Sequence, residues 1–425
     1  MLVSNVPPKS MNEPPTPDFF PTWKKCVVVL LPFALAHFVS YLYRTVNAVV
    51  YPDIAEELDL AANQIGLLTS AYFLAFALAQ LPVGVCLDRY GPRRLQIPML
   101  MLAVLGALGF SYATTVTELV IARGVIGLGV AGCLMSAMKA SSLWFSQEYL
   151  PLIMAVLLSV GGMGAMASTV PMHMVIDIAG WRYAFIILAM LTLSVVVLIL
   201  MVVPEQYQRQ DTLFVDMLLA VKQLYSSWSF WRLVLYSVFA NAAYMSIQGL
   251  WMGPWLRDVA GFSLDDVSYI LFLCTVAMCA GSLLFGILAN YLRRFGVQPI
   301  LVCGFGIALF ILCQCLMVID TGISPVLIVI SFSFFGTAAT LNYAIVAQSM
   351  PVNLTGRVST SFNLIIFLLA FIMQWGMGSI INLWEIVDGR YPLIAYQYAF
   401  GIVIIFQFFG LYIWLSFSPW RRGEK

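Results

Sequence analysis

Long apolar runs separated by short polar stretches dominate the chain. Each run has about the length that a helix needs to cross a bilayer, which is roughly 20 apolar residues. Barrel strands would instead alternate apolar and polar positions over about ten residues, and the sequence does not show that alternation. The pattern therefore predicts an all-α membrane protein with twelve transmembrane helices, at residues 26–50, 64–87, 95–113, 118–144, 150–176, 183–203, 231–256, 268–289, 297–318, 323–347, 357–382 and 395–417.

The longest polar connection divides these runs into two groups of six. Within it, apolar side chains between Asp211 and Tyr225 recur at near-helical spacing, which predicts an amphipathic helix at the membrane interface. The first tail is proline-rich and has no apolar core, so we interpret it as flexible and not as a signal peptide. The expected parts are a flexible cytoplasmic tail (1–25), an N-terminal six-helix bundle (26–203), a cytoplasmic linker (204–229), a C-terminal six-helix bundle (230–417) and a second cytoplasmic tail (418–425).

Composition and charge placement fit this picture. Hydrophobic residues make up 62% of the chain and charged residues 10%, which excludes an ordinary soluble domain. The net charge of +1 gives no sign of a nucleic-acid partner. With twelve spans, fifteen of the twenty-one Lys and Arg residues fall on one side, three on the other and three within spans. Because positive residues collect in cytoplasmic loops, we expect both termini in the cytoplasm of a bacterium, with the protein in its inner membrane.

The sequence offers no set of residues that would suit an enzyme. The eight cysteines lie in or beside apolar runs, where small polarisable side chains commonly pack. The chain shows no Ser/His/acid set, metal-ligand spacing or paired carboxylates, and no phosphate-binding loop that would indicate ATP drive. We therefore expect no enzymatic activity, no metal and no cofactor, and we expect a monomer whose partners are the lipid bilayer and a small solute.

A charged loop occurs in both halves of the chain. The first copy covers Gly84–Arg94, and a degraded copy covers Gly286–Gly296, at an offset of 202 residues. Asn290 in the second copy replaces Asp88 of the first. A loop that recurs in the same membrane context indicates a duplicated protein built from two bundles, and this architecture favours transport over bond chemistry.

The first loop resembles the signature between helices two and three of the major facilitator superfamily. Residues 123–129, an arginine followed four residues later by glycine, resemble the family's fourth-helix motif, and residues 180–185 resemble the tryptophan–arginine run before its sixth helix. The resemblance covers the chain from about residue 26. It implies two six-helix bundles related by a pseudo-two-fold axis, with a substrate between them near mid-membrane and alternating access by rocking.

The resemblance also implies gating residues. Asp88 would lie at a helix end and pair with arginines and a helix N-terminus across the bundle interface, closing the cytoplasmic side. Because Asn290 lacks the charge, the first loop would dominate. The alternative is that the arginines anchor the loop to anionic lipid. The predicted gating residues are Gly84, Asp88, Arg89, Gly91, Arg93, Arg94, Asn290, Arg293 and Arg294.

Cations without matching acids lie inside the predicted spans. His37, Arg44, Arg123 and Lys139 fall within apolar runs, whereas each Asp and Glu fits a loop, a tail or a helix end. Buried charges are costly and usually face a cavity or a partner, so a cavity lined by cations favours an anionic substrate. We expect Lys139 to extend to the cytoplasmic surface, and Arg123 to serve conformation as much as binding.

One face of the first span has the chemistry of an anion site. On an ideal helix His37, Tyr41 and Arg44 fall within about 60° of one another, and Asn47 flanks them. Imidazole, phenol and guanidinium together can cradle a carboxylate or a phosphate. The alternatives are an Arg44 that snorkels outward and a His37 that is simply packed and neutral.

The second half supplies polar and aromatic candidates. Tyr244, Gln248 and Trp251 recur on one face of the seventh span, and Trp251 could instead belong to an aromatic belt at the membrane surface. The side-chain amides of Asn363 and Gln374 could equally form hydrogen bonds between helices. Position 246, which corresponds to Arg44 at the offset of 202 residues, is serine. The resemblance implies a clamp of two arginines, one from each half, in superfamily members that carry organophosphates, so the missing second arginine puts phosphate esters in doubt. The full set of predicted substrate-binding residues is His37, Tyr41, Arg44, Asn47, Arg123, Tyr244, Gln248, Trp251, Asn342, Asn363 and Gln374.

These features predict a secondary active transporter of a small organic anion, such as a carboxylate metabolite or a carboxylate siderophore, working by symport. A coupling proton could be carried by His37, by Asp88 or by the substrate. The alternative is a proton-coupled efflux pump for drugs or metabolites with the same fold. The glycine–proline–glycine–glycine run that antiporters of this superfamily often carry is absent from residues 161–171, which disfavours that alternative.

Overall fold

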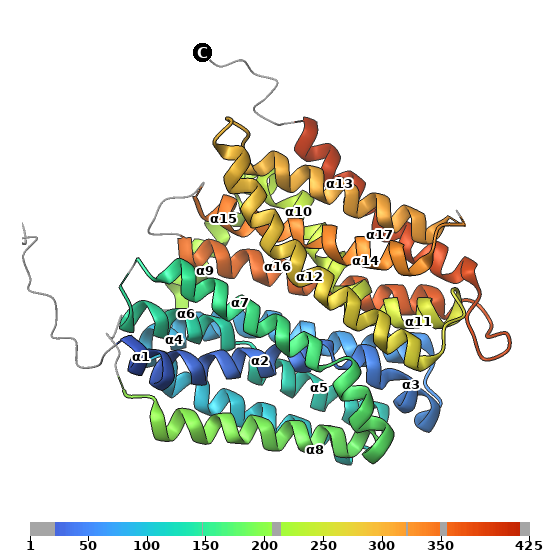
Figure 1. Ribbon diagram of the computed structural model, residues 1–425, viewed down its shortest axis with the longest axis horizontal. Helices are drawn as coiled ribbons and strands as arrows, with labels where there is room; N and C mark the ends of the chain where they lie inside the picture. The colour runs from blue at the N-terminus through green and yellow to red at the C-terminus, as the bar shows by residue number, and fades with distance from the viewer. Residues whose placement is uncertain (1–21, 147, 206–213, 320–321, 349–354, 417–425) are drawn as a thin grey trace, which may run out of the picture.

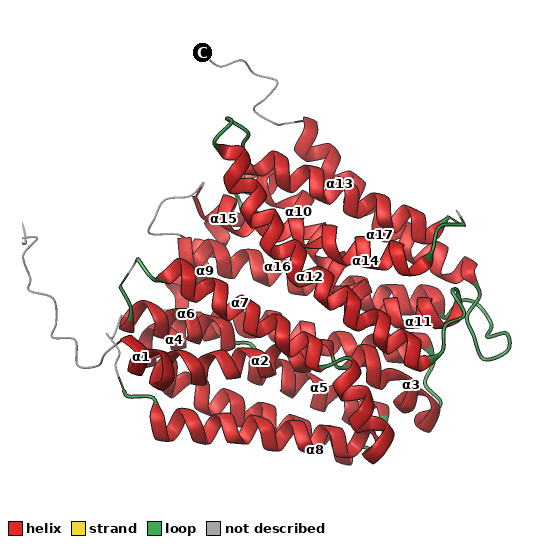
Figure 2. Cartoon of the chain, in the orientation of Figure 1, coloured by secondary structure: helices red, strands yellow, loops and turns green. Residues whose placement is uncertain are grey.

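The computed structural model describes residues 22–146, 148–205, 214–319, 322–348 and 355–416. In these ranges the chain is helical apart from short loops, and Figure 2 shows no strand among them. Ten helical stretches are long and apolar enough to cross a membrane. The prediction of an all-α membrane protein is thus confirmed. Most of the first predicted tail, at 1–21, the whole of the second, at 418–425, and part of the polar connection, at 206–213, lie outside the described residues.

The helices of the first half follow the predicted runs. They are α1 (Thr22–Lys25), η1 (Cys26–Leu30), α2 (Leu31–Thr45), α3 (Asn47–Leu58), α4 (Ala62–Tyr112), α5 (Val116–Val130), α6 (Cys133–Trp144), α7 (Leu150–Ala167) and α8 (Val170–Val202). The second half contains α9 (Phe214–Tyr225), α10 (Trp228–Ser246), η2 (Ile247–Trp251), α11 (Met252–Asp258), α12 (Leu264–Arg293), α13 (Pro299–Val318), α14 (Pro325–Gly336), η3 (Thr337–Thr340), α15 (Leu341–Gln348), α16 (Thr355–Ile381) and α17 (Leu393–Ser416).

Two of the ten membrane-length stretches contain a break. Helix α4 and the stretch Leu152–Val202 are each 51 residues long, and a straight helix of that length would extend about 76 Å, more than twice the hydrocarbon thickness. Gly91 in α4 has φ 80° and ψ 168°, and Gly180 in α8 has φ 81° and ψ 161°. Glycine adopts this region readily because it has no Cβ, so each break marks a place where the helix can turn back.

Packing shows that the chain does reverse in both stretches. On α5, Gly127 packs against the backbone of Tyr72 and Gly129 against that of Ala103, so distant parts of α4 lie side by side. In the second stretch, Gly164 packs against Phe38, while Thr192 bonds to Tyr43 at 3.1 Å. Each stretch therefore supplies two crossing-length segments.

The two halves of the sequence occupy different parts of the molecule. Figure 1 shows the blue and green helices α1–α8 in the lower part and the yellow to red helices α12–α17 in the upper part. Helix α9 packs at one end of the second half, where Leu224 joins a cluster with Phe230 and the Tyr225 hydroxyl donates to the Ser361 carbonyl at 2.9 Å. We call residues 22–205 the N half and residues 214–416 the C half.

Candidate functional site

Arg44 lies between the two halves, inside a cage of aromatic rings. Its guanidinium carbon is 4.7 Å from the ring centre of Tyr41 on α2, 5.0 Å from that of Phe367 on α16 and 5.9 Å from that of Phe76 on α4. Such rings attract a cation through their negative faces. Phe76 and Phe367 also stack on each other at 4.2 Å. Within the described residues, Arg44 has no hydrogen-bond or ion-pair partner.

His37 lies on the same helix and is almost completely buried. Its side chain is 2% exposed, and neither ring nitrogen has a hydrogen-bond partner among the described residues. The imidazole meets the Tyr41 ring edge-on, with ring centres 5.1 Å apart. Gly161 of α7 stands against it, so that an added Cβ would lie 2.8 Å from Nε2. The predicted stripe of His37, Tyr41 and Arg44 is thus one continuous surface.

Arg123 on α5 is completely buried within the N half. Its Nη2 donates to the Tyr43 carbonyl at 2.6 Å, and its guanidinium lies 5.0 Å from the Tyr72 ring centre. Tyr72 lies close enough to both Arg44 and Arg123 to interact with them electrostatically. Every one of these Arg123 contacts belongs to the N half. Asn47, at the start of α3, is 2% exposed and its Oδ1 has no partner among the described residues.

Several buried polar groups of the C half are candidates for the site. The Tyr343 hydroxyl donates to Asn363 Oδ1 at 2.5 Å, and Tyr343 interacts electrostatically with Arg44 and Tyr41. Gln248 lies in the π-helical turn η2, and its Oε1 is buried. Gln374 on α16 is fully buried. Neither the Gln248 oxygen nor either amide atom of Gln374 has a partner among the described residues, which is uncommon in proteins and suits a site that water or a ligand fills.

Three candidates in the C half are engaged by neighbouring helices. Asn342 accepts from the Tyr236 hydroxyl at 2.9 Å and donates to the Leu233 carbonyl and to Ser237, so its amide bonds between helices. Trp251 is 2% exposed and donates to the Gln374 carbonyl at 2.9 Å, and this burial argues against a place in an aromatic belt. The ring of Tyr244 stacks on Phe332 with centres 5.8 Å apart.

The first charged loop makes an ordered set of contacts within the N half. Lys139 Nζ is 2.8 Å from Asp88 Oδ1, Arg93 donates to the Leu200 carbonyl at 2.7 Å, and Arg94 pairs with Glu205. We call the end of the helices that carries Asp88, Arg93 and Arg94 the arginine-rich end. Lys139 therefore binds Asp88, in contrast to the expected extension to the surface. Asp88 itself pairs with a lysine of its own half, whereas the resemblance implied arginines across the interface.

The second loop differs from the first. Asn290, Arg293 and Arg294 are exposed at the end of α12, and their side chains make no hydrogen bond or ion pair within the described part of the chain. The same packing cannot form there because Asn290 has no charge to attract a lysine. Gly296 keeps the positive φ, at 80°, that Gly91 shows in the first copy.

The two halves touch directly at the end of the helices that lies opposite the arginine-rich end. We call it the opposite end, and it carries Gly66 and Gly378. Gly66 of α4 and Gly378 of α16 approach each other closely beside the Trp251 ring. The Ala62 amide donates to the Tyr391 hydroxyl at 3.2 Å. These contacts place the start of α4 against the C half, and small residues are what let helix backbones come this close.

Charged residues also meet at this opposite end. His173 on α8 lies 2.9 Å from Asp177 and 3.8 Å from Asp265 of α12. The Trp181 indole donates to Glu57 at 2.7 Å and Arg182 pairs with the same carboxylate, which holds the pKa of Glu57 below its ordinary value. The tryptophan–arginine run thus links α8 to α3 through Glu57.

Sequence reasoning missed Phe76, Phe367 and His173. Phe76 and Phe367 give no signal in the sequence because an aromatic residue in an apolar run looks like any core residue. His173 is one of two histidines in the chain, and its spacing of four residues from Asp177 was a signal for a contact on one helix face.

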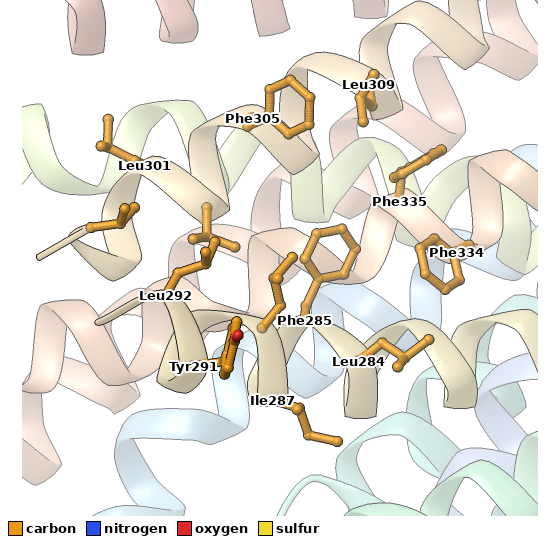
Figure 3. A pocket seen from close by; sticks show the side chains of 13 residues that line it. Leu284, Phe285, Ile287, Tyr291, Leu292, Leu301, Phe305, Leu309, Phe334 and Phe335 are labelled. Carbon is orange, nitrogen blue, oxygen red and sulfur yellow. The ribbon is translucent and has the colours of Figure 1, made fainter. Parts of the chain in front are cut away.

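A large apolar pocket lies away from the Arg44 cage. It has a volume of about 590 Å³ and opens between α12, α13 and α14. Figure 3 shows Phe285, Phe305 and Phe334 among its walls, with the Tyr291 hydroxyl as the one polar atom drawn. The exposed fraction of 67% for Phe305 shows that the pocket is a groove at the surface of the molecule. A groove without charge does not suit an anion.

Comparisons with known proteins agree with the fold. The profile of the Major Facilitator Superfamily matches residues 33–374. A probable sulfoacetate transporter of Cupriavidus necator is 23% identical over 350 residues, covering 78% of this chain and 80% of that protein. A hexuronate transporter of Bacillus subtilis is 23% identical, covering 79% and 82%. The crystal structure of a bacterial homologue of the human lysosomal transporter Spinster superposes with a TM-score of 0.71 at 16% identity, covering 93% and 97%.

Proposed function

The chain belongs to the major facilitator superfamily, and on that premise we propose that it carries a small organic anion through a site centred on Arg44. The family and the relatives that match this chain are membrane transporters and not enzymes. The open questions are therefore which solute is carried and how the carrier is driven. The structure bears on the first of these through the groups that surround Arg44.

The observation that carries the proposal is the isolation of the Arg44 charge. Arg44 is partly buried, and a guanidinium that loses part of its contact with water is stabilised when an anion or several acceptors compensate it, which aromatic rings do only in part. Within the described residues no carboxylate pairs with Arg44. An arriving carboxylate would supply the missing partner, and the planar fork of arginine matches it with two parallel hydrogen bonds.

The groups around Arg44 suit a solute that also bears hydroxyl or other polar groups. Tyr41 lies against the guanidinium, Tyr343 interacts with it electrostatically, and Gln374, on the same helix as Phe367, has a buried amide whose donors and acceptor are unused by described residues. Phe76 and Phe367 form an apolar wall across both halves. A cage of this kind fits a small molecule with one acidic group and a short polar body, and it does not fit a bulky lipophilic drug.

The two relatives support an anionic solute. Both are named for transport of acids, sulfoacetate in one case and hexuronate in the other, and each of these acids bears a carboxylate. The alternative function, a proton-coupled efflux pump for drugs or metabolites, has less support. We propose sulfoacetate-like or uronate-like carboxylates as the solute class for this chain.

Alternating access would move the solute between the two ends. In this structure the halves meet at the end that carries Gly66 and Gly378, so the solute would enter or leave at the arginine-rich end. The distribution of Lys and Arg predicts that this end faces the cytoplasm of a bacterial cell. The direction of net transport would then follow the gradients of the solute and of a coupled ion.

Replacement of Arg44 tests the proposal. Arg44→Gln should lower uptake of sulfoacetate or D-glucuronate into proteoliposomes at least about thirtyfold, because loss of one partner of a buried charge pair costs about 2 kcal/mol or more. Arg44→Lys keeps the charge but loses the fork and should recover only part of the activity. Uptake of the radiolabelled acids and their affinity by calorimetry are the measurements.

Arg390→Lys is a matched control, because Arg390 is an exposed arginine in a loop at the opposite end. It should transport like the unmodified protein. Full uptake and affinity in both Arg44 variants would show that the anion binds elsewhere. Failure of the unmodified protein to bind either acid would exclude this solute class.

A further inference from the structure

His37 stands out among the buried polar groups of the N half. It is 2% exposed, and both ring nitrogens lack a hydrogen-bond partner within the described residues. A buried donor or acceptor left unpaired costs about 1–3 kcal/mol. Tyr41 meets the ring edge-on and cannot satisfy either nitrogen in that arrangement. The geometry suits a partner that is present only during part of the transport cycle.

The surroundings of His37 contain one charge. On its own helix the titratable neighbours are Tyr41 and Arg44, and Arg44 acts on the imidazole electrostatically. On α7 the facing residue is Gly161, which has no titratable group. Tyr244 of α10 interacts electrostatically with Tyr41, and Cys279 of α12 lies against Gly162, next to Gly161. Within the described residues, no carboxylate faces the ring.

Asp88, the other protein group considered as a proton carrier, does not share this setting. Its carboxylate lies 2.8 Å from Lys139 at the arginine-rich end, and its side chain is 34% exposed. It is held as an ion pair away from the Arg44 cage. His37, in contrast, is on the same helix face as Arg44 and two turns away, so that its charge state responds to whatever Arg44 binds.

We propose that His37 is the residue that carries the coupled proton, and that it takes up this proton only when an organic anion occupies Arg44. Without the anion, the positive guanidinium and burial both oppose an imidazolium. A bound carboxylate cancels the guanidinium charge and offers an acceptor for a new N–H. The inference rests on the proposed function, because it needs an anion at Arg44.

The step balances in charge and atoms. A proton from water at the open end bonds to one imidazole nitrogen, and the anion binds Arg44 in the same state of the carrier. When the halves rock, both cargoes face the other end. The N–H bond then breaks, the proton returns to water and the anion leaves. For a monoanion the transfer is electroneutral, and binding of each cargo strengthens binding of the other.

The first test measures protons and anions together. Proteoliposomes that contain a pH-sensitive dye are given D-glucuronate or sulfoacetate, and dye signal and radiolabel uptake are read in the same sample. We expect about one proton per anion for D-glucuronate with the unmodified protein, as linkage between the two sites requires. His37→Gln should reduce that ratio at least about tenfold while exchange of labelled for unlabelled anion persists within about threefold.

His173→Gln is the matched control. It removes the other histidine of the chain, which lies at the opposite end beside Asp177 and Asp265. Its proton-to-anion ratio should equal that of the unmodified protein, whatever its rate. An unchanged ratio in His37→Gln would overturn the assignment, and so would anion uptake without proton movement in the unmodified protein.

A second measurement uses the unmodified chain and does not depend on how a His37 variant folds. Addition of D-glucuronate to the detergent-purified protein in weak buffer should remove about one proton per bound anion from solution. Arg44→Gln should abolish both binding and proton uptake. Anion binding without proton uptake would refute the assignment and leave the proposed function intact, whereas absence of anion binding would refute the proposed function.

Discussion

The two ends of the helices are organised by different kinds of contact. At the opposite end, several contacts cross between the two halves: Gly66 packs on Gly378, the Ala62 amide bonds to Tyr391, and His173 lies 3.8 Å from Asp265. At the arginine-rich end, the ion pairs of the first loop join residues of the N half to one another, as Asp88 and Lys139 do. Close packing acts over a few ångströms, whereas ion pairs near water are weakened by solvent and salt.

This difference indicates which contacts must break when access alternates. Opening at the opposite end requires the glycine contact and the bond to Tyr391 to separate, because both cross from one half to the other. The Asp88–Lys139 pair ties α4 to α6 and can move with the N half as a rigid unit. Asp88 would then influence gating by keeping its loop in shape, and not by latching the two halves together as the family resemblance implied.

In the comparison of the two ends, the largest effect is expected from Gly378→Ala. The added Cβ would lie 2.5 Å from the Ala62 carbonyl oxygen and 2.9 Å from the Trp251 ring, and overpacking of this kind costs about 1–3 kcal/mol. The halves should separate more readily at the opposite end, and transport should fall about tenfold. Thiol labelling of a cysteine placed at Ala62 should speed up correspondingly.

Gly376→Ala provides the comparison. It lies two residues away on the same helix, gains the same helix propensity and has no atom within 4 Å of its added Cβ. Its transport and labelling should match those of the unmodified protein. Equal behaviour of the two glycine variants would mean that close packing does not close this end.

A smaller effect is expected at the arginine-rich end. Asp88→Asn removes a partly exposed ion pair worth about 1 kcal/mol or less, so transport should fall about threefold to fivefold while the affinity for the solute stays the same. Lys139→Gln should give a similar loss. Transport kinetics and melting temperature in detergent, at low and high salt, are the measurements.

The double variant decides whether the pair acts as a unit. If Asp88 and Lys139 work only through each other, the double substitution should be no worse than either single one. Fully additive losses would instead support a latch that Asp88 makes without Lys139. A loss of solute affinity in Asp88→Asn would contradict a role confined to gating.

The smallest effect is expected in the second loop. Arg293→Ala removes an exposed side chain that makes no ion pair with described residues, and such substitutions usually change stability by less than about 0.5 kcal/mol. Transport should stay within about twofold of normal. A loss as large as that of Asp88→Asn would show that the two copies of the loop are more alike than their contacts suggest.

Much of the fold was readable from local sequence because membrane spans have a simple physical requirement. Apolar runs of about 20 residues identify the crossings, and the run at 118–144 agrees with the stretch Val116–Trp144. The reversals at Gly91 and Gly180 fall in the short gaps between predicted runs. The stripe of His37, Tyr41 and Arg44 followed from helix periodicity alone, since neighbours at three and four residues share a face.

Contacts between helices were less accessible. Asn342 looked like a possible ligand, but its amide is engaged by Tyr236, Leu233 and Ser237. Lys139 looked like a surface lysine, but it pairs with Asp88. An amide or a charge in an apolar run indicates that the side chain needs a polar partner. It does not reveal whether that partner is another helix or a solute.

The sequence by itself determined the helical membrane architecture, the duplicated loop and the excess of cations over acids inside the spans. These properties depend on hydrophobicity, periodicity and charge, which are local. Only the tertiary structure decided that Phe76 and Phe367 enclose Arg44, that His37 has no partner among the described residues and that the halves meet at Gly66 and Gly378. Those facts depend on which helices touch, because the same apolar side chain serves equally well against lipid, core or solute.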